Sequence, residues 1–141
     1  MSGVLIVANQ TLPSTALAEA IAARIRSGVD VFHVVVPATP VAHGFTWDEE
    51  ESHREASARL DKLLERLRAH GVTASGEVGD RDPINAVRDA LRDHEIDEIL
   101  LSTLPPGISR WLGQDVPSRL RGAVNVPVDV VYEGVQAATG G

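Results

Sequence analysis

Residues 102–111 combine small, hydroxyl, glycine and basic residues at a point where a helix is expected to begin. First-turn amides of a helix have no partner within the helix, and the helix dipole adds positive potential there. Such a position favours an anion, and an arginine adds a charge-assisted hydrogen bond to phosphate. We therefore predict an anion site whose contacts are Ser102, Thr103, Gly107, Ser109 and Arg110. The alternative is a structural turn, stiffened by its two prolines, with Trp111 packed in the core.

The charge distribution agrees with an anion site in this part of the chain. Between Arg110 and Arg121 there are three arginines and one acid, whereas the whole chain has a net charge of −7. A local excess of positive charge in an acidic protein favours a bound anion.

A second polar group, Asn9, Gln10 and Thr11, follows the first apolar run of the chain. Its side chains suit polar contacts to the base or ribose of a ligand, and they equally suit a turn that caps the next helix. Val36 and Gly79 end two further apolar runs and complete the candidate binding residues. Residues 79–83 also contain a pair of aspartates, for which a turn and helix cap is favoured over an acid–base or metal site.

Motifs of the common enzyme classes are absent from the sequence. There is no cysteine, no G-x-S-x-G elbow, no G-x-G-x-x-G and no P-loop, and the single lysine, Lys62, lies within an expected helix. The five histidines show no i, i+4 pair, and we interpret them as scattered surface or partly buried residues: His33, His43, His53, His70 and His94. The sequence therefore predicts a protein that is not an enzyme and that has no catalytic or metal-binding residues.

Five short apolar runs alternate with amphipathic segments, and this alternation indicates the fold. The runs have the length of strands and cover residues 4–8, 31–36, 72–78, 96–101 and 126–132. Apolar residues at helical spacing lie between them, in residues 17–25, 56–67, 84–91 and, less regularly, 108–120, where Pro117 is expected to kink or split the helix.

Capping residues mark the expected ends of these helices. Thr46 and Glu49 match a capping box at the start of the second helix, and Asp82 precedes a first-turn proline at the start of the third. Gly28 and Gly71 follow the ends of the first two helices. Residues 37–44 form a long connection, which we interpret as a lid over a ligand or as variable surface.

This order predicts an α/β fold with a doubly wound, five-stranded parallel sheet in the flavodoxin-like or Rossmann-like order 3-2-1-4-5, with helices on both faces. A crevice is expected at the carboxyl ends of strands one and four, where the chain reverses its direction of winding. The chain of 141 residues, 43% of them apolar, fits one domain over residues 1–133 and a disordered tail over residues 134–141. We expect a soluble, cytoplasmic protein that binds neither nucleic acid nor membrane.

Four segments resemble the universal stress protein family. Residues 4–9 look like its first strand, residues 79–87 like the entry to its third helix, and residues 97–103 like its fourth strand. Residues 107–112 followed by 126–128 resemble its last helix and strand, so the resemblance covers nearly the whole chain. It implies a doubly wound fold, homodimers and, in one branch of the family, ATP bound at the switch-point crevice.

The ATP pattern of that branch, G-x2-G-x9-G-[ST], is not preserved here. Ser102 or Thr103 stands near the first glycine, Leu104 or Pro105 near the second, and Gln114-Asp115 at the closing pair. Asn9 replaces an aspartate that commonly ends the first strand. We therefore expect a non-enzymatic regulatory module that binds ATP, another adenine nucleotide or another anion weakly.

Two other functions stay open at this stage. One is a protein-interaction module whose crevice is filled by Leu104, Pro105 and Trp111, and the other is a flavin-binding protein of similar topology. We also expect a homodimer through the fifth strand, because this sheet edge is β-prone and apolar. Its residues are Val126, Val128, Val130, Val131 and Tyr132.

Overall fold

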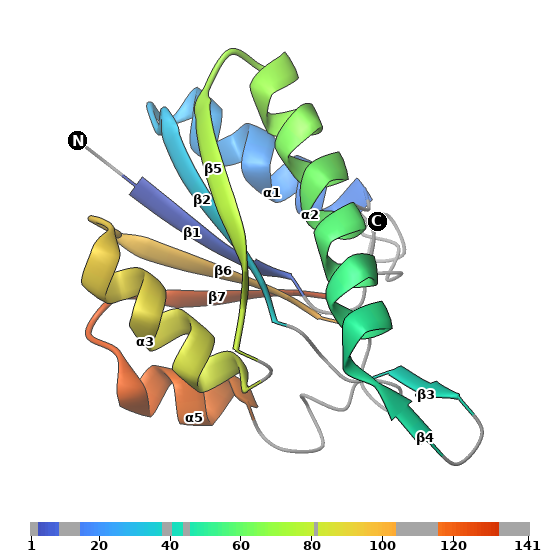
Figure 1. Ribbon diagram of the computed structural model, residues 1–141. Helices are drawn as coiled ribbons and strands as arrows, with labels where there is room; N and C mark the ends of the chain where they lie inside the picture. The colour runs from blue at the N-terminus through green and yellow to red at the C-terminus, as the bar shows by residue number, and fades with distance from the viewer. Residues whose placement is uncertain are drawn as a thin grey trace.

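The computed structural model describes residues 3–8, 15–37, 41–43, 46–80, 82–103 and 116–132 of the chain (Figure 1). The strands are β1 (Gly3–Ala8), β2 (Val31–Pro37), β3 (Val41–His43), β4 (Thr46–Asp48), β5 (Thr73–Gly79), β6 (Glu98–Thr103) and β7 (Val128–Tyr132). The helices are α1 (Thr15–Arg26), α2 (Glu49–Ala69), α3 (Pro83–Asp93) and α5 (Val116–Ala123).

The main sheet has five parallel strands in the order β5-β2-β1-β6-β7, which confirms the predicted order 3-2-1-4-5. The central strand β1 pairs with β2 on one side and with β6 on the other. All six of its residues are buried. This burial explains the unbroken apolar run, because a central parallel strand is covered on both faces.

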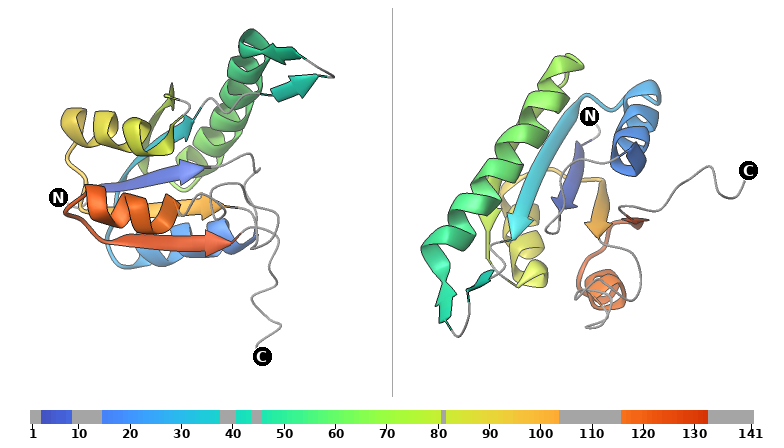
Figure 2. Two further views of the ribbon diagram at one scale, coloured as in Figure 1. Left: turned by 90° about the horizontal axis from the view of Figure 1, so that it is seen from below. Right: turned by 90° about the vertical axis from the view of Figure 1, so that its right-hand side faces the viewer.

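Helices α1 and α2 cover one face of the sheet, and α3 and α5 cover the other (Figures 1 and 2). The core divides in the same way, because successive side chains of a strand point to opposite faces. Val4, Ile6 and Ala8 pack in the cluster under α1 and α2. Leu5 and Val7 pack in the cluster under α3 and α5.

Three of the predicted helix boundaries are confirmed. Asp82 is the N-cap of α3, where its Oδ1 accepts a hydrogen bond of 2.9 Å from the amide of Ile84, and Pro83 occupies the first turn. Gly28 and Gly71 follow α1 and α2 with positive φ angles of 106° and 80°. Glycine adopts this left-handed conformation without steric strain.

The capping box predicted at Thr46 is wrong. Thr46–Asp48 is strand β4, which pairs in antiparallel register with Val41–His43, and α2 begins at Glu49. The β-branched and aromatic residues at positions 46 and 47 favour a strand once a partner strand is close in sequence. Strand β3 lies within the predicted connection of residues 37–44 and β4 follows that connection, and the two strands form a small sheet separate from the main one.

Other boundaries also differ from those predicted. The fifth strand begins at Val128, so Val126, predicted as part of this edge, precedes it. Strand β6 continues through Ser102 and Thr103, which we had expected in a turn, because they pair with Val131 and Tyr132 of β7. Pro117 lies in the first turn of α5, where its missing amide breaks no helical hydrogen bond. The predicted helical residues 108–115 and the predicted tail 134–141 lie outside the described residues. Within the described part, no helix is both long and apolar enough to cross a membrane.

Candidate functional site

The predicted crevice lies at the carboxyl ends of β1 and β6, which are neighbours in the sheet. The chain leaving β1 continues into α1 on one face, and the chain leaving β6 continues to α5 on the other. Connections that diverge to opposite faces create the switch point at which doubly wound folds bind ligands. Six of the predicted contacts lie outside the described residues: Asn9, Gln10, Thr11, Gly107, Ser109 and Arg110.

The four described candidates all lie near the carboxyl edge but are divided between the two faces of the sheet. Ser102 pairs with Ala8, which places Ser102 on the face covered by α1 and α2, together with Val36. Thr103 follows Ser102 and therefore faces the other side. The side chains of Val36, Ser102 and Thr103 are all buried.

Gly79, the fourth candidate, has a structural reason to be glycine. A Cβ atom at this position would lie 2.9 Å from both Ala86 of α3 and Val35 of β2. In the turn that follows, Asp80 Oδ1 accepts a hydrogen bond of 2.8 Å from the amide of Asp82. Together with the N-cap at Asp82, this contact confirms for the described residues the turn and helix cap that the sequence favoured over an acid–base pair.

A groove of about 380 Å³ between α3 and α5 contains part of the basic segment predicted from the sequence. Arg88 of α3 and Arg119 of α5 line it, together with the polar side chains of Asp82 and Asn85. The sequence indicated the positive charge of residues 110–121 but not Arg88, whose contribution depends on the packing of α3 against α5.

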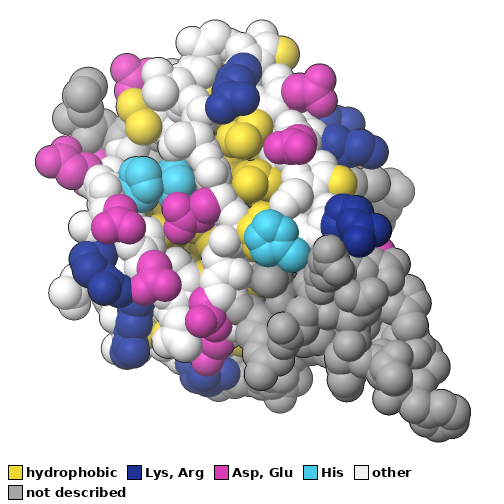
Figure 3. All heavy atoms as spheres, viewed as in Figure 1, with side chains coloured by type: hydrophobic (Ala, Val, Ile, Leu, Met, Phe, Trp, Pro, Cys, Tyr) yellow, Lys and Arg dark blue, Asp and Glu magenta, His cyan; other side chains and the backbone are white. Residues whose placement is uncertain are grey.

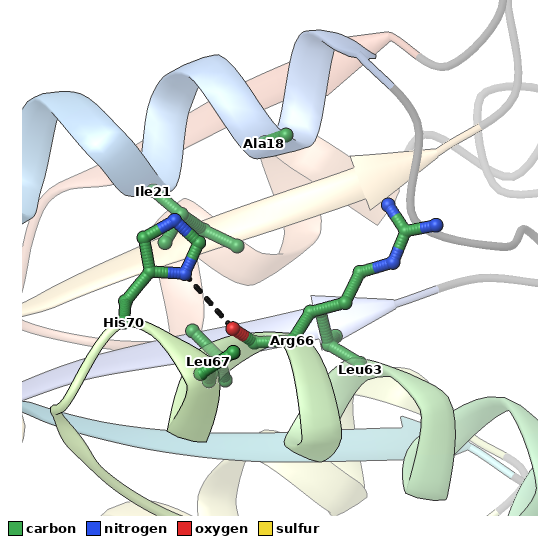
Figure 4. A pocket seen from close by; sticks show the side chains of 7 residues that line it. Ala18, Ile21, Leu63, Arg66, Leu67 and His70 are labelled. Carbon is green, nitrogen blue, oxygen red and sulfur yellow. Dashed lines mark hydrogen bonds between the residues drawn. The ribbon is translucent and has the colours of Figure 1, made fainter.

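A second, mainly apolar pocket of about 290 Å³ lies between α1 and α2, on the other face of the sheet (Figure 4). Ile21, Leu63 and Leu67 form its apolar wall. His70 lies beside Ile21 and donates from Nδ1 to the carbonyl oxygen of Arg66 at 2.9 Å. The sequence identified these apolar residues as helix faces but did not predict that the two faces leave a pocket between them.

A cluster of polar side chains around His33 was not predicted from the sequence. This histidine cluster consists of four residues: His33 of β2, Ser75 and Glu77 of β5, and His94 at the C-terminal end of α3. His33 is only 3% exposed, and its Nδ1 lies 2.9 Å from Ser75 Oγ. The ring of His94 stacks on that of His33, with the ring centroids 3.8 Å apart.

Glu77 completes the histidine cluster, with its Oε2 3.6 Å from His33 Nε2. This separation is longer than a hydrogen bond, and the buried Nε2 has no hydrogen-bond partner among the described residues. Burial lowers the pKa of His33, and the neighbouring His94 lowers it further, while Glu77 acts in the opposite direction. His33 is therefore held mainly as neutral imidazole near neutral pH.

The interpretation of all five histidines as scattered was wrong for His33 and His94. They are distant in the sequence, and the register that pairs His33 with Ser75 of β5 brings the cluster together. A single polar residue inside the apolar run of β2 was the one signal available. On the side of the molecule seen in Figure 3, histidine and acidic side chains lie next to one another at the surface.

Comparison with known proteins identifies the fold. No protein-family model and no curated protein matches this sequence. A solved universal stress protein from Archaeoglobus fulgidus is similar with a TM-score of 0.60 and 18% identity, over 94% of each chain. A protein of the universal stress protein family from Burkholderia pseudomallei is similar with a TM-score of 0.56 and 16% identity, over 89% of this chain and 93% of that one.

The sheet order of this chain defines its class first, a doubly wound α/β domain. The two solved structures are similar to it over 94% and 89% of this chain. Within that class, the fold is that of universal stress proteins. The resemblance predicted from the sequence is thereby confirmed for the fold.

Proposed function

We propose that this protein is a non-enzymatic, cytoplasmic regulatory module of the universal stress protein type, which binds a nucleotide or another anion weakly at the crevice between β1 and β6. The observation that carries the proposal is the switch point itself. β1 and β6 are adjacent, and their continuations lead to opposite faces of the sheet, which opens a ligand position in folds of this topology.

The basic residues of the segment that follows β6 support an anionic ligand. Arg119, within the basic segment of residues 110–121, faces a groove that also contains Arg88. Guanidinium groups hold phosphate through pairs of parallel hydrogen bonds. Arg110, which lies in the same segment, is the proposed contact that reaches the ligand.

The sequence limits how tightly ATP binds. Asn9 has no charge with which to hold a magnesium ion, and Gln114-Asp115 replaces the closing glycine and hydroxyl residue of the ATP pattern. We therefore expect a Kd for ATP above about 10 µM, which corresponds to less than roughly 7 kcal/mol of binding free energy.

Isothermal titration calorimetry of the full chain with Mg-ATP tests this proposal. Arg110→Ala is expected to weaken binding by about 1.5–3 kcal/mol, the range for a hydrogen bond to a charged group. Arg92→Ala is the control, since Arg92 is exposed on α3 and paired with Asp89. A submicromolar Kd would contradict weak binding, and an unchanged affinity in Arg110→Ala would remove that residue from the site.

If ATP does not bind, native mass spectrometry of freshly purified protein can identify another anion. It detects a retained ligand and the oligomeric state in one measurement. A protein that carries no ligand and shows no heat of binding with ATP, ADP or inorganic phosphate would favour the second candidate function, a module that acts through protein contacts.

We also propose a homodimer through β7, which is compatible with either candidate function. Tyr132 is 37% exposed at the end of this edge strand. Ile99 of β6 donates to the carbonyl oxygen of Pro127, and bonded residues alternate along a parallel pair. The amides of Val128 and Val130 therefore point away from β6, toward the open side of the sheet. A second copy of the strand would satisfy them under a two-fold axis.

A further inference from the structure

We propose that His33, Glu77 and His94 bind a divalent transition-metal ion, with Zn²⁺ as the closest match to the ligand set. This site is separate from the proposed anion crevice. His33 is the third of seven residues in β2 and Glu77 the fifth of seven in β5, so the cluster lies beside the middle of these two strands, with His94 at the C-terminal end of α3. The crevice lies instead at the carboxyl ends of β1 and β6. The inference goes beyond the proposed function and does not depend on it.

The donor atoms are already grouped. One ligand atom from each of His33, Glu77 and His94 lies within 4.8 Å of the others. Zinc bonds to imidazole nitrogen and carboxylate oxygen are about 2.0–2.2 Å long, so the three atoms must draw together by about 1 Å to share one ion. Glu77 and His94 are half-buried at the surface, and the ring of His94 must turn out of its stacked position to direct a nitrogen at the ion.

His33 is held in the orientation that a metal ligand requires. Its Nδ1 is hydrogen-bonded to Ser75 Oγ, which leaves Nε2 directed toward Glu77. Histidine ligands characteristically have their second ring nitrogen fixed by such a partner. Burial keeps the ring mainly neutral, which is the form that coordinates metal.

The unsatisfied Nε2 atom is the second, independent observation. It is buried and lacks a hydrogen-bond partner among the described residues, which is unusual for a buried polar atom. When Nδ1 donates to Ser75, Nε2 presents a lone pair to the Glu77 carboxylate, which is also an acceptor. A cation between the two groups satisfies both of them, and Asp93 adds negative potential nearby.

The ligand chemistry selects the class of ion. Two imidazoles and one carboxylate suit Zn²⁺, Ni²⁺ or Cu²⁺, whereas Mg²⁺ and Ca²⁺ prefer oxygen ligands. Three protein ligands leave one tetrahedral position for water or an additional ligand. Mg²⁺ and Ca²⁺ are therefore matched negative controls for the same titration.

The test is a Zn²⁺ titration of the full chain, first freed of metal, in competition with a chromophoric chelator. We expect one equivalent of Zn²⁺ bound, with no binding of Mg²⁺ or Ca²⁺. Glu77→Gln and His94→Gln should each lower the affinity more than tenfold. His53→Gln is the control, because His53 is an exposed histidine on α2.

A second readout keeps the proposal falsifiable even where a variant is less stable. At a free Zn²⁺ concentration 100 times the Kd, the melting temperature of the unmodified protein should rise by about 5–10 °C, the shift that linkage predicts for a chain of this size. The half-buried positions 77 and 94 are altered rather than 33, since His33 belongs to the packed interior. Absence of Zn²⁺ binding, or equal affinity in Glu77→Gln and the unmodified protein, would overturn the site.

Discussion

The two edge strands of the sheet, β5 and β7, each accept one hydrogen bond from an arginine side chain of a neighbouring helix. They differ in how closely the rest of each strand is packed. Arg68 of α2 donates to the carbonyl oxygen of Ala74 in β5 at 2.9 Å, and Arg121 of α5 donates to that of Val128 in β7 at 3.1 Å. In each case an arginine side chain donates a hydrogen bond to a backbone carbonyl near the start of an edge strand. Such contacts protect a sheet edge from pairing with another chain.

Beyond that arginine, β5 is held by close packing against its neighbours. Its residues include few that favour strands, and α2 lies along it (Figure 1). Gly76 is so tightly enclosed that a Cβ atom there would lie 2.9 Å from the carbonyl oxygen of Val34 and 2.5 Å from a methyl carbon of Leu60. Tertiary contacts therefore determine the conformation of β5, because its own β-propensity is weak.

β7 shows the opposite balance. Four of its five residues are β-branched or aromatic, which favours an extended strand without help from its neighbours. Its side chains are half-buried or exposed, and Val130 directs its amide away from the sheet. An edge with strong propensity and little cover is suited to a partner, whereas β5 depends on the exact space left by α2 and β2.

The largest effect on stability is expected at Gly76 of β5, where the neighbouring residues leave no space for a side chain. Gly76→Ala should lower the free energy of unfolding by about 3 kcal/mol, since a backbone oxygen is among the atoms that must move. Urea denaturation measures it. Gly122→Ala in α5 is the control, because a Cβ there meets no heavy atom within 4 Å among the described residues, and it should be neutral or stabilising by up to about 1 kcal/mol. Equal midpoints for the two variants would refute the packing argument.

The next effect concerns the proposed partner of β7. Val130→Pro removes an outward amide, so it should weaken the homodimer at least tenfold, about 1.4 kcal/mol, while the strand stays paired with β6. Analytical ultracentrifugation at several concentrations measures the association.

A contrast variant separates the edge from the fold. The amide of Val131 points toward β6 by the same alternation, so Val131→Pro should lower the urea midpoint instead. An unmodified protein that sediments as a monomer at tens of micromolar would exclude the dimer. A dimer unaffected by Val130→Pro would place the interface elsewhere.

Features that depend on local sequence patterns, like the strand propensity of β7, are predicted well, whereas features that depend on tertiary packing, like the conformation of β5, are not. Strand periodicity and helix capping predicted the five-stranded sheet, its order and the caps at Asp82, Gly28 and Gly71, because these depend on local patterns. The antiparallel pair β3 and β4 was missed, since Thr46 and Glu49 match a capping box just as well as they match a strand followed by a helix.

The histidine cluster could not be predicted for a different reason. His33, Glu77 and His94 come from two strands and one helix, and only the register between β2 and β5 and the position of α3 bring them together. Gly79, in contrast, was predicted from the sequence only as a candidate ligand contact, and the structure gives it a packing role. A Cβ atom at this position would crowd Ala86 and Val35, which is reason enough for a glycine there.

A smaller effect on stability is expected at the ion pairs that join β6 and β7 to helix α1. Arg24 of α1 lies 2.7 Å from both Glu98 of β6 and Asp129 of β7, and its hydrogen bond to Glu98 is the main cause that raises the pKa of its guanidinium. Arg24→Ala should cost about 1 kcal/mol in urea denaturation, after allowance for screening by solvent. Arg92→Ala, which breaks an exposed pair with Asp89, should cost less than about 0.5 kcal/mol. Equal costs would mean that Arg24 does not anchor β7.

The smallest effect on stability is expected for the two arginines that bond to the edge strands, Arg68 at β5 and Arg121 at β7. Arg68→Ala and Arg121→Ala each remove one hydrogen bond from a long, solvated side chain, so each should cost about 0.5 kcal/mol of stability. Their consequences for association should differ. Arg121→Ala frees the carbonyl of Val128 at the proposed interface and should strengthen the dimer by a few-fold. Arg68→Ala frees the carbonyl of Ala74 on the other edge and should leave the association constant unchanged. Sedimentation of the two variants side by side therefore identifies the edge that pairs, and an increase in association with Arg68→Ala alone would assign the interface to β5.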